Sequence, residues 1–339
     1  MIQRGIGWQY LRSLALDAIP EQTRVYHTRA VPLNEWRRHG AFSVLSSTKK
    51  QIVIEAAGAE IGSALLADTE HLLDHAAEHR ACVHDAVTPG SWNSPAWTVV
   101  TAYYWAFFSV LALTRLTGRS AVFLDRQAVS DLRTLAGSAD QPGAGALYLA
   151  VEPYTTATTR TMTLRPSKAQ LHDAVWTVTH RLISDVSAHS DENANPTEHR
   201  LWWALKRAGD LLGADWTSKL RNAVNYRLGC GYREVTRTGQ IDIARHIARF
   251  TAGSVNDLAD EFEDEVVGIP ARLRDPGEDV RLFSRLLGLY AVLAASIVDT
   301  LHVDVLERQG GDQRWRGLRA RFLAERCSTP SHATWPFLG

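Results

Sequence analysis

Long stretches of the chain repeat apolar residues at the three- and four-residue spacing of a helix. This pattern runs through residues 57–83, while residues 96–116 and 286–298 are apolar with little interruption. Such segments predict helices that bury one face or their whole circumference. Gly118 is expected to end the second helix, and Ser167 and Asp215 are expected to begin later ones. Further helices are predicted at 167–187, 197–212, 215–229, 239–250, 254–266, 278–306 and 312–326.

Two segments depart from the helical pattern. Residues 41–55 (AFSVLSSTKKQIVIE) are typical of a pair of strands, and residues 146–164 are rich in Thr, Tyr and Val, with alternation in TRTMTL. We therefore predict a mainly α-helical protein with a small N-terminal β-containing extension and a β-hairpin insertion. The predicted organisation is an N-terminal extension with short strands (1–56), a helical bundle (57–250) with an insertion at 119–167, and a C-terminal helical region (251–339).

One segment, Ala86 to Thr114, carries no charged residue and is long enough to cross a membrane. Pro89 and Pro95 interrupt its first part, and threonine, tyrosine and serine residues dilute the rest. The central helix of a soluble bundle is apolar all round in the same way. We therefore favour a buried central helix over a membrane span.

Composition narrows the class of protein. The 339 residues include 37 Lys and Arg against 37 Asp and Glu, and 45% are hydrophobic. This balance excludes a disordered chain and argues against nucleic-acid binding through bulk charge alone. Cys82, Cys230 and Cys327 form no zinc-finger or CxxC spacing. Sparse cysteines and a first segment without a signal-peptide pattern indicate the cytoplasm.

Known cofactor and nucleophile motifs are missing from the sequence. It contains no Walker A motif, no GxGxxG after a strand and no GxSxG. We therefore expect no nucleotide cofactor. His71, His75 and His79 repeat every four residues, a spacing that can chelate a metal from one helix face. A single helix supplies too few ligands, so we favour a solvated helix face and predict no metal site.

Two motifs together carry a resemblance to a known family. They are TAYYWAFFSVLALTRLTG at 101–118 and KLRNAVNYRLG at 219–229. The pair resembles the HEPN superfamily, helical-bundle proteins of prokaryotic toxin–antitoxin and antiviral defence systems. In that family a helix with a YY pair packs in the bundle core, and a later helix carries an Arg-x4-6-His motif. The resemblance implies metal-independent RNA cleavage by a homodimer whose subunits share the site.

The second motif matches the family only at its start. Arg221 and Asn222 match the Arg and the polar residue that follows it, but Tyr226 stands where the histidine is expected. The catalytic candidates are therefore Arg221 to stabilise a phosphate, Asn222 to position it, and Tyr226 in the place of the missing histidine. Tyr226 can also donate a hydrogen bond or stack on a base. The alternative is a buried polar network of Arg221, Asn225 and Tyr226.

Arginine is dense between residues 221 and 249, and this strip suits an RNA backbone. The nucleic-acid-binding candidates are Asn225, Arg227, Arg233 and Arg237. An acidic segment follows at 257–265, and we favour mutual neutralisation of the two segments within one subunit or between subunits.

These observations predict an RNA-binding or RNA-cleaving component of a bacterial antiviral defence or toxin–antitoxin system. The expected partners are RNA, a second copy of the chain and a partner protein of such a system, with no membrane. The alternative is a non-catalytic helical scaffold subunit of a multi-protein defence complex. The predicted RNA site requires Arg221 and Tyr226 to open into a shared, solvent-reachable cleft between packed helices, across the twofold axis of a dimer.

Overall fold

The computed structural model describes residues 4–20, 23, 31–87, 94–152, 158–227, 255–270, 273 and 275–308. Within these ranges it contains ten helices and five strands, so the predicted mainly α-helical class with a small β part is confirmed. The helices are α1 (Ile6–Ala18), α2 (Leu33–His39), α3 (Gly58–Val87), α4 (Pro95–Leu116), α5 (Arg126–Leu135), α6 (Leu171–His189), α7 (Pro196–Leu212), α8 (Trp216–Tyr226), α11 (Val255–Val267) and α12 (Val280–Arg308). The strands are β1 (Phe42–Ser47), β2 (Ile52–Ala57), β3 (Arg119–Leu124), β4 (Gly145–Val151) and β5 (Thr159–Pro166).

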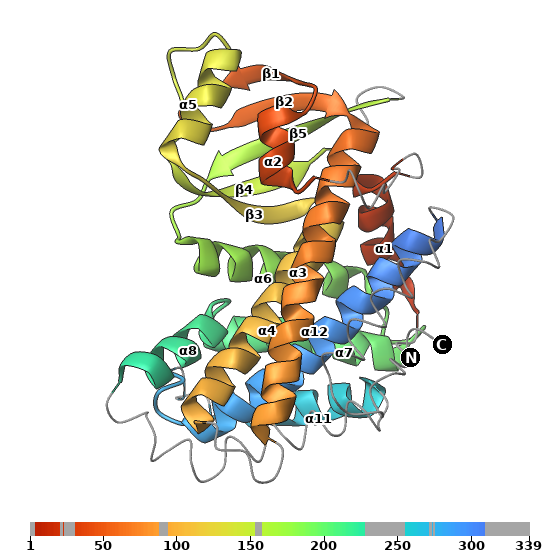
Figure 1. Ribbon diagram of the computed structural model, residues 1–339. Coiled ribbons are helices and arrows are strands. Elements are labelled where there is room, and N and C mark those ends of the chain that lie inside the picture. The colour runs from red at the N-terminus through yellow and green to blue at the C-terminus, as the bar shows by residue number, and fades with distance from the viewer. Residues whose placement is uncertain are drawn as a thin grey trace.

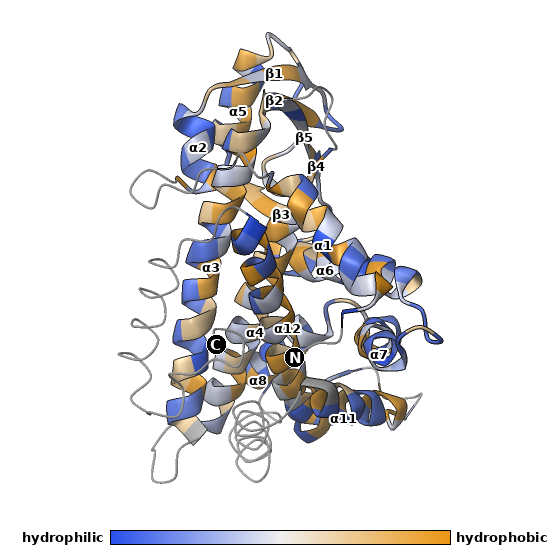
Figure 2. Cartoon of the chain, turned by 90° about the vertical axis from the view of Figure 1, so that its right-hand side faces the viewer, coloured by the Kyte–Doolittle hydropathy of each residue, from blue (hydrophilic) through white to orange (hydrophobic). Residues whose placement is uncertain are grey.

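The helices α4 and α12 form the centre of the helical part (Figure 1), and α4 also packs against α3, α6 and α8. Figure 2 shows hydrophobic residues concentrated along these two helices, whereas α7 and α11 are mixed. Helices α4 and α12 are long and apolar enough to cross a membrane. In their most apolar 18-residue stretches, however, 72% of α4 and 89% of α12 are buried inside the protein. The apolar segment is thus a core helix, as favoured from the sequence, and this burial is consistent with a soluble protein.

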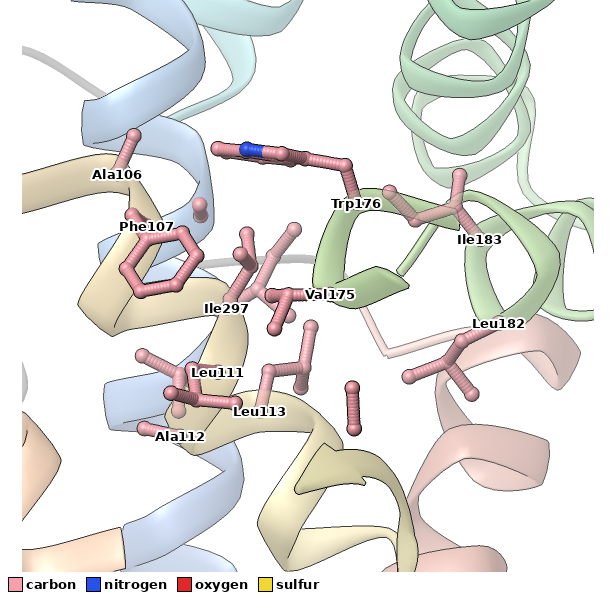
Figure 3. Close-up of a cluster of buried hydrophobic side chains, with 14 of the residues drawn as sticks. Ala106, Phe107, Leu111, Ala112, Leu113, Val175, Trp176, Leu182, Ile183 and Ile297 are labelled. Carbon is pink, nitrogen blue, oxygen red and sulfur yellow. The ribbon is translucent and has the colours of Figure 1, made fainter. Parts of the chain in front are cut away.

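Large side chains from three helices fill the space between α4, α6 and α12 (Figure 3). Phe107 and Leu111 of α4, Trp176 of α6 and Ile297 of α12 are all buried there. Each such side chain contributes about 1.5–3 kcal/mol relative to an exposed one. This packing fixes the first turns of α6, which contain His172, against α4.

The five strands form one antiparallel sheet in the order β1-β2-β5-β4-β3. The predicted strand pair is β1 and β2, and the predicted hairpin is β4 and β5. The strand pair and the hairpin were predicted in separate regions of the chain. In the structure β2 pairs with β5, with Ile54 opposite Met162, so the strand pair and the hairpin belong to one sheet. Two further elements of the insertion, β3 and α5, were not predicted.

The sheet is covered by short helices on its outer side and by α6 beneath it (Figure 1). Asp125 caps α5 by accepting a hydrogen bond from the amide of Ala128 at 2.7 Å. The cavity between α2 and the sheet measures about 20 Å³, room for a single water molecule. The sheet layer is therefore closely packed and contains no ligand-sized space at this point.

The N-terminal segment contributes a helix that was not predicted. Helix α1 contacts α6, α7 and α12. Asp304 of α12 accepts hydrogen bonds from Arg4 at 2.8 Å and from the indole of Trp8 at 3.2 Å. Helix α1 is thereby part of the helical core, although it precedes the first strand.

Helix ends agree with the sequence in some places and differ in others. Gly118 follows α4 with φ +63°, as expected of a residue that ends a helix. Helix α6 begins at Leu171, because the Ser167 hydroxyl accepts from the amide of Ala169 in a turn before the helix. Asp215 precedes α8 without a side-chain cap and pairs with Lys219 at 2.9 Å. The helices predicted at 239–250 and 312–326 lie outside the described residues.

Candidate functional site

Helix α8 carries the predicted site and packs against α4 and α12. Its apolar residues, among them Leu220, Ala223 and Val224, are buried against these helices. Arg221 lies on the flank of this buried face and is half-buried. Its guanidinium carbon lies 5.2 Å from the centre of the Tyr103 ring of α4, within reach of a cation–π interaction. The two motifs of the sequence resemblance therefore meet in space.

The other predicted residues lie elsewhere on or beyond α8. Tyr226 is 76% exposed, and Asn222 and Asn225 are exposed as well. Because five positions turn a helix by about 140°, Tyr226 points away from Arg221 within one chain, whereas Asn225 lies one turn along on the same side. The buried network of Arg221, Asn225 and Tyr226 considered from the sequence is not formed.

The predicted nucleic-acid-binding arginines are only partly described. Arg227 donates a hydrogen bond to Asp275 and forms an ion pair with it, while remaining exposed. Arg233 and Arg237 lie outside the described residues. Within the described residues, the acidic helix α11 pairs with Arg200 of α7, at 3.3 Å from Asp260, and with Arg285 of α12.

A hydrogen-bonded cluster surrounds the hydroxyl of Tyr103, which lies in the protein core. The hydroxyl oxygen lies 2.7 Å from Nδ1 of His172 and 3.1 Å from the hydroxyl of Ser218. The indole of Trp176 donates to it at 3.3 Å. Asp173 of α6 lies close to Ser218 and Arg221; burial raises its pKa, and both of these groups lower it. Helices α4, α6 and α8 each contribute to this cluster.

Two arrangements of protons fit these distances, because His172 and Ser218 can each donate or accept. In the first, the Nδ1–H of His172 donates to Tyr103 and the Tyr103 hydroxyl donates to Ser218; in the second, Ser218 donates to Tyr103 and Tyr103 donates to Nδ1 of His172. The phenol oxygen has two lone pairs, so in either arrangement it can also accept from Trp176. The first arrangement corresponds to the tautomer of His172 with a proton on Nδ1. Its Nε2 then carries a free lone pair, as a general base requires.

Burial and charge shift the pKa values in the cluster. Burial lowers the pKa of His172 from its ordinary 6.5, and the positive charge of Arg221 lowers it further. Burial raises the pKa of Tyr103 against the opposing effects of Ser218, Trp176 and Arg221. The imidazole is therefore neutral at neutral pH and the phenol keeps its proton, which agrees with both proton arrangements above.

Arg221 is a half-buried cation without a charged partner among the described residues, a state that it shares with Arg37 of α2. Within that part of the chain its Nε is also buried without a hydrogen-bond partner. Burial raises the pKa of the nearby Asp173, and the positive charges of Arg221 and Lys219 act in the opposite direction. A half-buried guanidinium with an unused donor is a binding site for an anion, and its fork of donors fits a phosphate.

The histidine next to Arg221 was missed from the sequence. His172 stands at the start of α6, where its ring stacks on Phe107 with centres 4.4 Å apart. It lies far from Arg221 along the chain, and neither its neighbours nor its spacing distinguishes it. The crossing of α4, α6 and α8 brings it to the site, and this is a property of tertiary packing.

The three histidines considered as metal ligands lie on α3. His75 and His79 stack on Phe108, with ring centres 5.0 and 5.4 Å away, and His79 also stacks on Tyr104. In the part of the chain that the structure describes, no three His, Cys, Asp or Glu side chains are grouped so that they could hold a metal ion. His75 and His79 thus form ring contacts with α4, whereas His71 contacts the ring of His75.

Compared with protein-family models, with curated proteins and with solved structures, the chain shows no match.

Proposed function

We propose that this chain is an RNA-binding and RNA-cleaving component of a bacterial antiviral defence or toxin–antitoxin system, acting in the cytoplasm. The site is the cluster of Arg221, His172, Tyr103, Ser218 and Asp173, called here the Arg221 cluster. The observation that carries the proposal is the half-buried guanidinium of Arg221, which forms no ion pair within the described residues, beside a neutral histidine. The sequence resemblance to the HEPN superfamily supports the same activity.

The cluster contains the groups that cleavage through the ribose 2′-hydroxyl needs. Nε2 of His172 takes the proton of the 2′-hydroxyl, and the 2′-oxygen attacks the adjacent phosphorus. The bond from phosphorus to the 5′-oxygen breaks, and the leaving oxygen takes a proton from water. Arg221 binds the phosphate and stabilises the negative charge that develops on it. The products are a 2′,3′-cyclic phosphate and a 5′-hydroxyl, and no metal takes part.

The remaining candidates have supporting roles in this proposal. Asn222 and Asn225 are exposed on α8, with Asn225 one turn along on the side of Arg221, and both can position the RNA backbone. Tyr226, exposed on another side of α8, offers a stacking surface or reaches the second subunit of a homodimer. In this scheme His172 takes the role for which Tyr226 was considered from the sequence, because a phenol with a pKa near 10 is a poor base at neutral pH.

Cleavage of end-labelled single-stranded RNA in EDTA tests the proposal. We expect the wild-type protein to release 2′,3′-cyclic phosphate ends and to leave an all-2′-deoxy strand intact. Arg221→Ala and His172→Gln should each lower the rate by about 100-fold or more. An Arg221→Ala variant that cuts as fast as the wild type would contradict the assigned site.

The structure supplies matched controls for both substitutions. Arg181 also lies over a tyrosine ring, 5.4 Å from the centre of Tyr148, so Arg181→Ala removes an equivalent cation away from the cluster. His189 also stacks on a ring, that of Tyr10 at 3.7 Å, and lies about 26 Å along α6 from His172. Both control variants should cleave RNA at the wild-type rate.

The alternative function is a non-catalytic scaffold subunit of a multi-protein defence complex. The exposed Tyr226 and Val267 favour it, because large apolar side chains on a surface often mark a contact with a partner. Purification of the native complex separates the two functions. A stably bound partner protein that is lost in Tyr226→Ala, together with no cleavage of RNA, would favour the scaffold.

A further inference from the structure

Five rings lie on the surface of α3 and α4 beside the Arg221 cluster. The aromatic strip consists of Trp97, Tyr104 and Phe108 of α4 with His75 and His79 of α3. Positions 97, 104 and 108 are spaced by seven and four residues, so they share one face of α4. Trp97 is 65% exposed, and Tyr104 and Phe108 are half-buried. The strip is therefore reachable from solvent along its length.

The rings of the strip are arranged with their planes nearly parallel. The planes of His79 and Phe108 differ by 17°, those of His79 and Tyr104 by 23°, and those of Tyr104 and Phe108 by 28°. At the other side, the edge of Tyr104 meets His172 with ring centres 6.2 Å apart. Tyr104 thus joins the strip to His172 of the Arg221 cluster, and Trp97 lies two turns before Tyr104 on the same face of α4.

The charges near the strip indicate which part of a nucleic acid it contacts. Glu78 lies 3.7 Å from His75, and Asp74 of α3 lies nearby in sequence on the same helix. Carboxylates repel phosphates, so a backbone cannot follow this surface. Ring faces bind the faces of unpaired bases irrespective of sequence. The surface therefore suits bases that stack inward while their phosphates point to solvent.

We infer that the aromatic strip is a stacking subsite for the unpaired bases of a single-stranded RNA whose scissile phosphate lies at Arg221; this inference rests on the proposed function. The distance from Trp97 to Phe108 along α4 is about 16 Å at 1.5 Å per residue. At about 3.4 Å per stacked nucleotide this length holds about five bases. The subsite selects single strands over duplexes, because paired bases do not offer their faces.

Binding of a fluorescently labelled single strand, made uncleavable by 2′-O-methylation, tests the subsite by anisotropy. Trp97→Ala should weaken binding about tenfold, and Trp97→Phe should restore most of it. Phe123→Ala is the matched control, since Phe123 is also an exposed ring (54%) but lies on β3. A duplex of the same sequence should bind the wild type and Trp97→Ala equally.

Salt dependence separates stacking from phosphate binding. Trp97→Ala should lower the affinity at every salt concentration without changing the slope of log K against log salt. Arg221→Ala should reduce that slope by about 0.7, the loss of one phosphate contact on a single strand. A lower slope in Trp97→Ala would contradict base stacking at the strip.

The outcomes distinguish failure of the subsite from failure of the proposed function. If Trp97→Ala binds like the wild type while Arg221→Ala no longer cleaves, the subsite is wrong and the proposed function stands. If Trp97→Ala weakens binding while Arg221→Ala cleaves normally, the subsite stands and the cleavage site is wrong. If Trp97→Ala changes the oligomeric state in sedimentation but not RNA affinity, the strip is a protein interface and the inference is overturned.

Discussion

Removal of one oxygen atom, in Tyr103→Phe, tests both the packing and the chemistry of the cluster. The variant keeps the buried ring and its contact with the guanidinium of Arg221, but it deletes the acceptor of the Trp176 indole. Buried Ser218 also loses the Tyr103 hydroxyl as a partner, whereas half-buried His172 can turn to water. The Trp176 N–H, in the core, is left without its acceptor. An unsatisfied buried donor costs about 1–3 kcal/mol, so the folding equilibrium constant should fall by about 5- to 150-fold.

Urea denaturation followed by tryptophan fluorescence and circular dichroism measures this loss. Tyr148→Phe is the control, because Tyr148 also lies under an arginine and its hydroxyl makes no hydrogen bond within the described residues. We expect a loss below about 0.5 kcal/mol there. RNA cleavage by Tyr103→Phe should fall at least tenfold with little change in KM, because the tautomer of His172 is no longer set. Equal stability of the two variants would refute the hydrogen-bonded cluster.

Three further predictions concern other parts of the fold. Gly118→Ala should destabilise the protein by about 1–3 kcal/mol more than Gly137→Ala, as measured by paired urea denaturation. Both glycines have positive φ, but a Cβ at Gly118 would meet side chains of α1 and β4 within 3.1 Å, whereas no atom lies near a Cβ at Gly137. The pKa of His172 in the folded protein lies below 6.5, so neutral His172 contributes fully to protein stability above pH 6.5, and this contribution is lost as pH falls through the folded pKa. The difference in unfolding free energy between wild type and His172→Gln should therefore shrink from pH 7.5 to 5. Asp304→Asn should cost about 1–3 kcal/mol by weakening the hydrogen bond from Trp8, and hydrogen exchange in α1 should accelerate.

The central helices were predictable because a local run of apolar residues is enough to indicate that a helix is buried. A helix with no polar face, such as residues 95–116, can only be buried in protein or in lipid, and the prolines and hydroxyl residues favoured protein. Helix α5 was missed although Asp125 and the spacing of Ala128, Val129 and Leu132 mark an amphipathic helix. Its ten residues lie next to segments with the alternating pattern of strands, and the whole insertion was therefore interpreted as a hairpin.

The sheet depends on pairings that no local pattern specifies. The strand pair β1–β2 and the hairpin β4–β5 are each local in the chain and were predicted. The pairing of β2 with β5 joins segments about 100 residues apart, and only the packing of both on the helices selects it. For the same reason the sequence placed two β regions in separate parts of the chain, while the structure contains one sheet.

The site shows the same division between local and tertiary information. Arg221 was found because it belongs to a contiguous motif, and helix periodicity correctly placed Asn225 on its side. The distance between Arg221 and Tyr226 around the helix could have been worked out from the same periodicity, since five positions turn the helix by about 140°. His172 could not be found in this way, because it reaches Arg221 only through the crossing of α4, α6 and α8.

Tyr103 connects the two motifs more closely than packing alone requires. It is the first tyrosine of the YY pair, and a core helix needs only its ring for burial. Its hydroxyl, however, accepts from Trp176 and links His172 to Ser218, while its ring lies beneath the guanidinium of Arg221. A phenylalanine would bury the same area without the cost of desolvating a hydroxyl. In the proposed function the hydroxyl orients His172, which we propose as the base that the second motif lacks.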